Sequence, residues 1–206
     1  MHGKEVPVGG SLTRGPVGID VSAITHSILE PNLLAIRTPL GTGLHTGDWK
    51  IDPDPLLAAP TDKAAIRRLG DAGVLALVCA STNVFVDGEA GSESSVRVAL
   101  AELISTLTGK VAAACFASNV ARMDSIIRAA EANDRRVCLV GRSMIRMAAA
   151  ARSVGLLADV QAFISDSDAG HFPANKILYL CTGSQGEPRA ALAQVADGTH
   201  PHLSLG

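Results

Sequence analysis

The chain has 206 residues, of which 47% are hydrophobic and 18% charged, and its formal net charge is -2. This balance excludes a disordered polyelectrolyte and a strongly basic tail that coats nucleic acid. No apolar run approaches the roughly 18 residues of a membrane span, so we expect a globular protein with no membrane partner. The N-terminus lacks the features of a secretory signal, which favours the cytoplasm.

The cysteine pattern agrees with a reducing compartment. The four cysteines lie in apolar runs at wide spacings, without a C-x-x-C pair, at positions 79, 115, 138 and 181. Free cysteine behaves as a small core hydrophobe, so buried reduced thiols are a better interpretation than metal ligands.

The first quarter of the chain has the pattern of an antiparallel meander. Short apolar or alternating runs at 19–24, 33–37 and 44–46 are separated by turn residues. The segment Asp52-Pro53-Asp54-Pro55 then breaks the pattern, because each proline removes an amide donor and disfavours helix at the residue before it. We interpret it as a linker that ends a first domain, 1–55.

From Thr61 onward, predicted helices and strands alternate. We expect helices at 61–69, 92–107, 118–132, 143–154 and 188–195, and strands at 74–79, 111–116, 137–140 and 176–181. The strands are apolar throughout, which is typical of a parallel sheet covered on both faces. The prediction is an α/β fold in which a second domain, 56–206, holds this sheet.

Four loops that follow predicted strands are rich in hydroxyl, amide or glycine residues. They are 80–83, 116–119, 141–143 and 182–187. The carboxyl ends of parallel strands share one edge, so we expect the loops to converge there, where helix N-termini favour an anion such as phosphate. Ordinary cap and turn roles explain the same residues about equally well.

A histidine and an aspartate give the best candidate for a metal site. His26 follows the first strand of the meander and Asp48 the third, so both emerge at the same edge. Imidazole and carboxylate suit zinc or manganese, but catalytic zinc usually has three protein ligands. A loop histidine and a turn aspartate without metal are at least as probable. We assign His45 a structural role within its strand. The other histidines are expected to be surface residues rather than metal ligands: His171, His200 and His202.

Several motifs resemble one known family. They are Thr25-His26-Ser27-Ile28-Leu29-Glu30-Pro31-Asn32, Ala35-Ile36-Arg37-Thr38-Pro39, His45-Thr46-Gly47-Asp48-Trp49-Lys50, Ser81-Thr82-Asn83, Phe116 to Arg122, Val140 to Ser143, and Cys181 to Pro188. In this order they are similar to ribonuclease J, a family of bacterial RNA-degrading enzymes. The resemblance spans about residues 15 to 205.

The resemblance implies a fold for each half. Residues 1–55 are expected to be the C-terminal part of a metallo-beta-lactamase half-domain, a partial β-meander, and 56–206 a beta-CASP-like α/β domain with a parallel sheet. The family's first histidine cluster and its last motifs have no counterpart in the 206 residues. We therefore expect this chain by itself to be an incomplete, inactive member.

The resemblance also implies metal chemistry. His26 and Asp48 match family ligands of two divalent ions, usually zinc, that activate water to attack an RNA phosphodiester. The family has an acidic residue, thought to donate a proton, immediately before Ser-Thr-Asn. Here that position is Ala80, which cannot transfer a proton, so no catalytic position is intact.

For single-stranded RNA, the resemblance directs attention to the loops of the second domain. The candidate contacts for RNA or its phosphates are Ser81, Ser118, Asn119, Arg122, Arg142, Ser184 and Gln185. Arg122 either meets a phosphate bidentately or is a solvated helix residue. With 4 Phe, 1 Trp and 1 Tyr, the chain lacks the stacking platform of a dedicated single-strand binder, so we expect weak affinity.

Two functions remain open. The first is a metal-dependent ribonuclease that becomes competent only when a longer chain or a partner completes it. The second is a non-catalytic module that binds RNA or docks onto a full-length ribonuclease, with unpaired strand edges that also favour a homo-oligomer. Nucleotide binding by 182–187 is weaker, because the loop has neither G-x-G-x-x-G nor a Walker lysine.

Overall fold

The chain forms two compact units, Met1–Ser92 and Glu93–Gly206. The computed structural model describes residues 5–57 and 59–204. The division falls well after the predicted boundary at 55 and 56, because the next helix and strand join the first sheet rather than the second.

The first unit is built on a five-stranded sheet. Its strands, which neighbour one another in chain order, are β1 (Ser11–Arg14), β2 (Val17–Ala23), β3 (Asn32–Thr38), β4 (Gly41–His45) and β5 (Ala76–Val78). Strands β1 to β4 pair antiparallel, which confirms the meander, and β5 pairs parallel to β4. Strand β1 was not predicted.

The prediction for β5 is wrong in two respects. Its apolar run indicated a buried strand of the parallel sheet, but it forms the edge of the first sheet. Leu75, Leu77 and Val78 are 68%, 60% and 58% exposed. A continuous apolar run marks a strand without saying which sheet it joins or whether anything covers it.

Helix α1 (Lys63–Ala72) connects β4 to β5 and covers one face of the sheet. It begins where the Asp62 carboxylate accepts a hydrogen bond from the Ala65 amide at 2.8 Å, as a helix cap does. Its apolar side packs through Ile66 and Leu69 on the core formed by Ile24, Leu33, Ala35 and Leu44. The packing explains why this segment belongs to the first unit.

The segment 52–55 is anchored rather than a free linker, which corrects the prediction. Asp52 is only 4% exposed. Its amide donates to the Thr25 hydroxyl at 3.0 Å, and its carboxylate accepts from the Asp54 amide at 2.9 Å. Aspartate and proline therefore shape a local turn here, a role that the sequence pattern does not separate from that of a linker.

The second unit contains a three-stranded parallel sheet. Its strands are β6 (Val111–Ala114), β7 (Arg136–Val140) and β8 (Ile177–Cys181), in the order β6-β8-β7. Its helices are α2 (Glu93–Ser105), α3 (Val120–Ala132), α4 (Arg142–Ser153), α5 (Asp166–Ala169) and α6 (Ala191–Ala196), with a 3-10 turn, η1 (Ala174–Lys176). Only α5 and η1 were not predicted.

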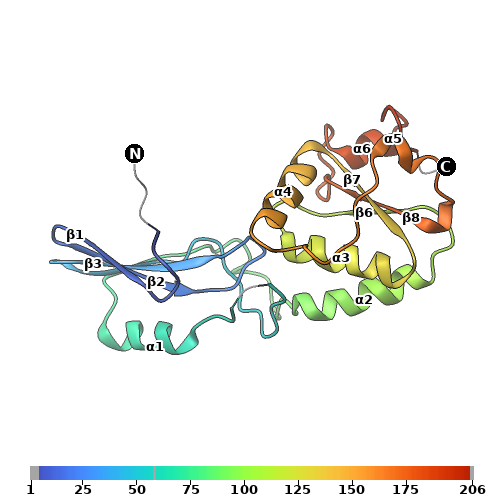
Figure 1. Ribbon diagram of the computed structural model, residues 1–206. Coiled ribbons are helices and arrows are strands. Elements are labelled where there is room, and N and C mark those ends of the chain that lie inside the picture. The colour runs from blue at the N-terminus through green and yellow to red at the C-terminus, as the bar shows by residue number, and fades with distance from the viewer. Residues whose placement is uncertain (1–4, 58, 205–206) are drawn as a thin grey trace. The chain divides into compact units, whose positions relative to one another are not determined.

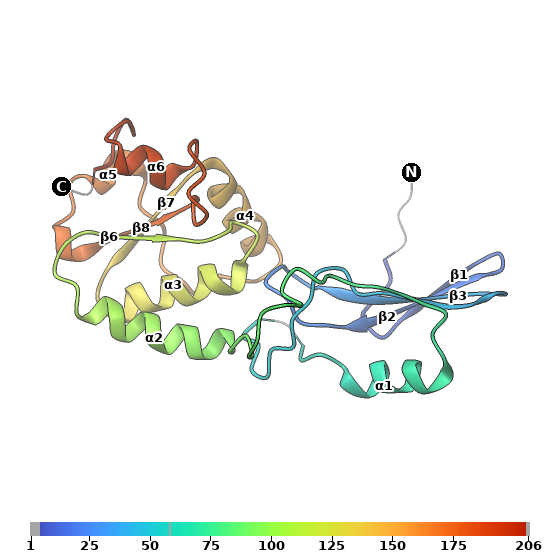
Figure 2. The ribbon, with the colours of Figure 1, turned by 180° about the vertical axis from the view of Figure 1, so that it is seen from behind.

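Helices lie on both sides of this sheet, as the apolar strands predicted. Helices α2 and α3 run along one side, and α5 and α6 lie on the other (Figures 1 and 2). All five residues of the central strand β8 are buried. Tyr179 and Cys181 of this strand pack with Ala191 and Val195 of α6.

An ion-pair network secures α3. Asp124, which is 2% exposed, pairs with Arg97 of α2 and with Arg128 one turn further along α3. Arg128 also pairs with Asp159 at 2.9 Å. Its two carboxylate partners raise the pKa of Arg128 further above its ordinary value, so the pairing favours the charged guanidinium.

Within residues 5–57 and 59–204, no helix has the length and apolar character to cross a bilayer.

Candidate functional site

Three predicted site positions meet at one edge of the first sheet. Strands β2, β4 and β5 run in the same direction, since β2 and β4 are both antiparallel to β3 and β5 is parallel to β4. The positions that follow them are His26, Asp48 and Ala80. The Thr46 amide donates to the Val78 carbonyl at 3.0 Å, which holds the last two of these loops side by side.

A backbone bridge joins the His26 and Asp48 segments. Thr25 and Lys50 form an isolated antiparallel bridge, in which the Lys50 amide donates to the Thr25 carbonyl at 2.9 Å. His26 is one residue from this bridge and Asp48 two. The convergence predicted from the meander therefore holds for the backbone, while metal binding by the two side chains stays a prediction.

The Thr25 hydroxyl holds this edge together, a role that no sequence pattern indicated. Thr25 is 1% exposed. Its hydroxyl donates to the Lys50 carbonyl, accepts from the Asp52 amide at 3.0 Å and lies 2.8 Å from the Thr61 hydroxyl. The Thr61 hydroxyl also accepts from the Thr25 amide at 3.0 Å. Three loops thus depend on one buried pair of threonines.

The described residues do not form a metal centre by themselves. In residues 5–57 and 59–204, no group of three or more His, Cys, Asp and Glu side chains is placed to hold an ion. His26 is partly buried, with its Nδ1 3.4 Å from the Ser27 hydroxyl, and Asp48 is exposed. These two donors fall short of the three that a catalytic zinc site takes from protein.

Other polar groups beside this edge have structural partners. His45 ends β4, as expected, and its Nδ1 accepts from the Gly47 amide at 3.2 Å. The Lys50 ammonium lies 3.0 Å from the buried carboxylate of Asp52. These contacts shape the turn that presents Asp48.

In the second unit, three of the four predicted loops lie at one edge of the parallel sheet. Segments 116–119, 141–143 and 182–187 follow β6, β7 and β8, which run parallel. The fourth loop, 80–83, follows β5 and belongs to the other sheet, which corrects the prediction for Ser81. The alternation of predicted strands and helices located each strand end but did not show which sheet β5 joins.

Two glycines allow the loops after β7 and β8 to approach closely. Gly141 has φ +111°, and a Cβ there would lie 3.0 Å from the Thr182 hydroxyl. Gly183 has φ +116°, and its Cβ would lie 2.9 Å from that of Ala190. Only glycine adopts such backbone easily, so the tight mouth of this sheet edge requires both.

The candidate phosphate contacts differ in how far they are already engaged. Asn119 caps α3, since its side-chain oxygen accepts from the Arg122 amide at 2.9 Å. The Arg122 guanidinium donates two hydrogen bonds to the Glu93 carboxylate, from Nε at 2.6 Å and from Nη2 at 3.1 Å. This ion pair replaces the solvated arginine considered from the sequence, and the phosphate contact of Arg122 stays a prediction. The exposed candidates in this unit are Ser118, Arg142, Ser184 and Gln185.

Three cysteines are buried as expected, and one is not. Burial raises the pKa of Cys115 to about 11 and those of Cys138 and Cys181 to about 12. Such thiols stay protonated near neutral pH and, being buried, are poor nucleophiles. Cys79 is exposed beside the edge strand β5, which corrects the expectation of four buried thiols.

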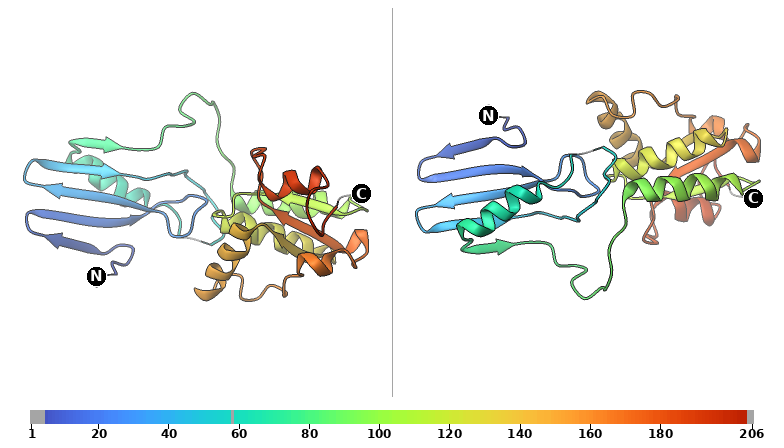
Figure 3. Two further views of the ribbon diagram at one scale, coloured as in Figure 1. Left: turned by 90° about the horizontal axis from the view of Figure 1, so that it is seen from above. Right: turned by 90° about the horizontal axis from the view of Figure 1, so that it is seen from below.

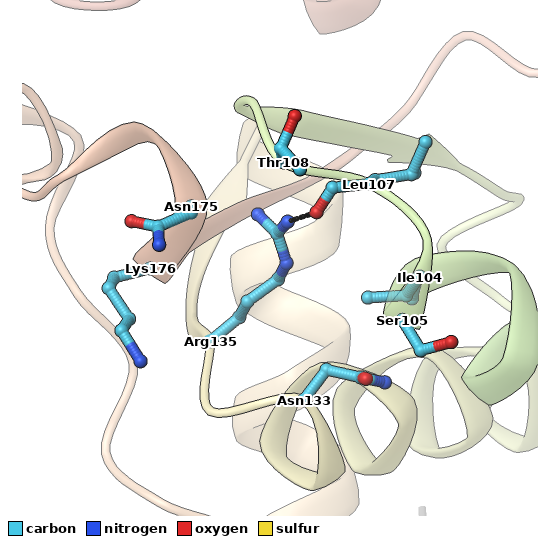
Figure 4. A pocket seen from close by; sticks show the side chains of 8 residues that line it. All are labelled: Ile104, Ser105, Leu107, Thr108, Asn133, Arg135, Asn175 and Lys176. Atoms are coloured by element: carbon cyan, nitrogen blue, oxygen red, sulfur yellow. Dashed lines mark hydrogen bonds between the residues drawn. The ribbon is translucent and has the colours of Figure 1, made fainter.

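A cavity of ≈ 200 Å³ lies away from these loops, at the amino ends of the parallel strands (Figure 4). Arg135 is 2% exposed there and donates to the carbonyl oxygens of Leu107, Gly109, Ala174 and Ile177. The guanidinium thus satisfies carbonyl groups around the start of each strand. We assign this arginine a structural role.

Comparison with known proteins identifies the relatives of this chain. The family model for the beta-CASP domain of ribonuclease J matches residues 108–206. A protein named Ribonuclease J from Sinorhizobium meliloti is 46% identical over 94% of this chain and 35% of its own length. Ribonuclease J from Mycolicibacterium smegmatis is 44% identical over 98% of this chain and 36% of its own length.

Structural similarity extends to a more distant protein. A crystal structure of a protein of unknown function from Enterococcus faecalis V583 matches with a TM-score of 0.60 at 14% identity, covering 86% of this chain and 44% of that one. At this identity the likeness concerns the fold alone.

The sequence similarity runs through both units, whereas the family model lies within the second. The chain spans about a third of the length of the two relatives described above. The parallel sheet with helices on both sides belongs to the beta-CASP match, and the mixed α/β fold confirms the predicted class. By this similarity, the chain belongs to the ribonuclease J family.

Proposed function

We propose that this chain is part of a metal-dependent ribonuclease that hydrolyses RNA phosphodiester bonds. The observation that carries the proposal is the 46% identity to a Ribonuclease J over 94% of the chain. The convergence of His26 and Asp48 at one sheet edge supports it. Three buried thiols are compatible with the cytoplasm as the compartment of action.

The metal ions are the part of the proposal that needs residues beyond those described. His26 and Asp48 supply an imidazole and a carboxylate, which suit zinc, with manganese as the alternative. Two donors do not complete a centre, so we derive no catalytic step from them. Their role in the proposal is to bind the ion weakly and to hold it beside the loop that carries Ala80.

Ala80 favours a second candidate function. Where the family resemblance calls for an acidic proton donor, this chain has a methyl group, and loss of a general acid typically lowers a rate 100- to 10,000-fold. A non-catalytic module that binds single-stranded RNA, or docks onto a full-length ribonuclease, needs no such donor. The exposed Ser118, Arg142, Ser184 and Gln185 remain the proposed RNA contacts in either case.

RNA binding with and without metal tests both candidates. We expect the chain to bind 5'-monophosphorylated single-stranded RNA weakly, with a Kd of about 10 to 100 μM at physiological salt, by fluorescence anisotropy. Zinc or manganese should strengthen binding at least about threefold if the ion bridges protein and phosphate. His26→Ala should abolish this metal effect, whereas His171→Ala, on the exposed surface, should keep it.

Turnover of the same RNA separates the two functions. No cleavage is expected from the chain alone, because the metal centre is incomplete and Ala80 cannot donate a proton. Strong cleavage that survives His26→Ala would contradict the assigned metal ligands. Absence of RNA binding under every condition would remove RNA recognition from both candidates.

A further inference from the structure

The basic side chains of the second unit differ in whether an internal group holds their charge. Most of them donate to carboxylates or to backbone carbonyl oxygens of the same unit: Arg97, Lys110, Arg122, Arg128, Arg135, Arg136, Arg152 and Lys176. In the described residues 93–204, the side chains of Arg142, Arg146 and Arg189 make no hydrogen bond or ion pair. These guanidinium groups are therefore available to a ligand.

The unengaged arginines lie at one edge of the parallel sheet. Helix α4 begins at Arg142, directly after Gly141 and the end of β7. A Cβ on Gly141 would lie 3.0 Å from the Thr182 hydroxyl and 3.5 Å from the Cβ of Ala191. These two residues close the loop between β8 and α6, since the Ala191 amide donates to the Thr182 hydroxyl at 3.3 Å. That loop carries Arg189, so Arg189 and the start of α4 border the same sheet edge.

Arg142 and Arg146 lie on the same side of α4. They are four residues apart, which places them about 6 Å from each other along the helix axis. Both side chains are exposed. The turn that follows exposes Ala149 and Ala150, whose small methyl groups leave room for an extended ligand to lie along the helix.

The positive charges at the start of α4 are unfavourable unless an anion lies beside them. The N-terminus of a helix carries a partial positive charge, which favours anions and disfavours cations. The first turn of α4 has no acidic residue, and neither Asp nor Glu occurs from Arg142 to Ser153. Like charges four residues apart also repel each other. A polyanion bound to Arg142 and Arg146 would relieve both repulsions.

One carboxylate is close to Arg189 in the sequence but is not paired with it. Glu187 is exposed, and its carboxylate accepts a hydrogen bond from the Gln185 amide at 3.1 Å. In the described part of the chain it forms no ion pair with Arg189. The guanidinium of Arg189 thus stays exposed in the loop that also exposes Ser184 and Gln185.

We propose that Arg142, Arg146 and Arg189 form an arginine track that binds the phosphate backbone of single-stranded RNA. The track rests on the proposed function and extends it, since it adds Arg146 and Arg189 to the candidate contacts. A guanidinium fork binds a phosphate bidentately, and neighbouring arginines can bind successive phosphates of one strand. Similarity to ribonuclease J favours RNA over an acidic protein as the polyanion at this edge.

The salt dependence of RNA binding by the whole chain tests the arginine track. A labelled, 5'-monophosphorylated single-stranded RNA is titrated in the presence of a chelator at about 50 to 200 mM salt, and fluorescence anisotropy gives the Kd. We expect Arg146→Gln and Arg189→Gln each to weaken binding about 3- to 10-fold at the lowest salt. Each should also reduce the slope of log Kd against log salt by about 0.7, the value for one phosphate contact of a single strand.

The matched control is Arg67→Gln. Arg67 is exposed and makes no ion pair in the described residues of the first unit, and it lies on α1, the helix that covers one face of the first sheet (Figure 3). The substitution removes the same charge from the middle of a helix, so it should change the Kd less than about twofold. A second RNA of equal length and different base sequence should respond alike, because phosphate contacts do not read sequence. Circular dichroism checks that each variant is folded.

The outcomes separate the arginine track from the proposed function. Equal RNA binding by Arg146→Gln, Arg189→Gln and Arg67→Gln would overturn the track and leave the proposed function standing. Binding that depends on both track arginines, together with a metal effect that survives His26→Ala, would support the track and contradict the metal ligands.

Two results would remove RNA as the ligand of the track. Tighter binding to polyglutamate than to RNA of equal charge, lost in Arg146→Gln, would assign these arginines to an acidic protein instead. A wild-type chain that binds no RNA at about 50 mM salt would overturn both the track and RNA recognition by the loops.

Discussion

Thr25 concentrates several contacts of the candidate metal edge in one hydroxyl group. It bonds the Lys50 carbonyl, the Asp52 amide and the Thr61 hydroxyl, all in a region closed to water. A methyl group of the same size would fill the space and leave these polar groups without a partner. The position of His26 relative to Asp48 therefore depends on a side chain that does not itself bind metal.

Replacing this hydroxyl should destabilise the first unit. For Thr25→Val we expect the free energy of unfolding to fall by about 2 to 3 kcal/mol, since buried polar groups lose their hydrogen bonds while the shape is kept. Thr25→Ser keeps the hydroxyl and should lose less than about 1.5 kcal/mol. Urea unfolding followed by circular dichroism measures both. A Thr25→Val protein as stable as the wild type would show that the hydroxyl contributes little.

At the scale of elements, local signals in the sequence were enough to place most helices and strands. Asp62 and Asn119 cap the helices that follow them, and their side-chain hydrogen bonds explain why those starts could be located within two residues. A local pattern does not show which distant strand or residue a segment contacts. Nothing near Leu77 says that its strand joins the meander, and nothing near Asp52 says that Thr25 anchors it.

The candidate site was predictable to the same extent. The meander places His26 and Asp48 at one edge because strand direction follows from connectivity. The ion pair between Arg122 and Glu93 joins residues 29 positions apart, and no local sequence pattern predicts it. Long-range pairs of this kind depend on how helices pack, which the sequence alone does not fix.

The close approach of the loops after β7 and β8 gives an element-scale prediction. Gly141→Ala places a Cβ 3.0 Å from the Thr182 hydroxyl on a backbone with φ +111°, so we expect a loss of about 1 to 3 kcal/mol in stability. Gly70→Ala is the matched control. It lies within α1, where the added methyl would meet no atom within 4 Å apart from the helix's own nearby backbone, and it should stabilise the protein by about 0.5 to 1 kcal/mol. Thermal melts of both variants test the contrast, and equal melting temperatures would contradict it.

For the whole molecule, the buried thiols link stability to alkaline pH. Cys115, Cys138 and Cys181 have pKa values raised from 9.0 to about 11, 12 and 12 in the folded chain. Between about pH 9 and 11 the unfolded chain loses these protons and the folded chain keeps them. Stability is therefore complete below pH 9 and falls as the pH rises, by up to roughly 1.4 kcal/mol per pH unit for each thiol.

Urea unfolding at pH 8 and pH 10 measures this loss, and the reaction of the native protein with a thiol reagent at pH 8 gives an independent check. Cys79 should react quickly and the three buried thiols only after unfolding. Cys138→Ala should reduce the difference in stability between the two pH values. Four equally fast thiols in the native protein would contradict the burial on which the prediction rests.

The ion pair between Glu93 and Arg122 has a consequence for any nucleic acid that reaches the second unit. A carboxylate tethered to the first turn of α2 already occupies the guanidinium fork. A backbone phosphate would have to displace an internal competitor of like charge, so the arginine would become available only to a ligand bound strongly through other groups. A weakly bound polyanion would not displace Glu93 and so would not bind the Arg122 guanidinium.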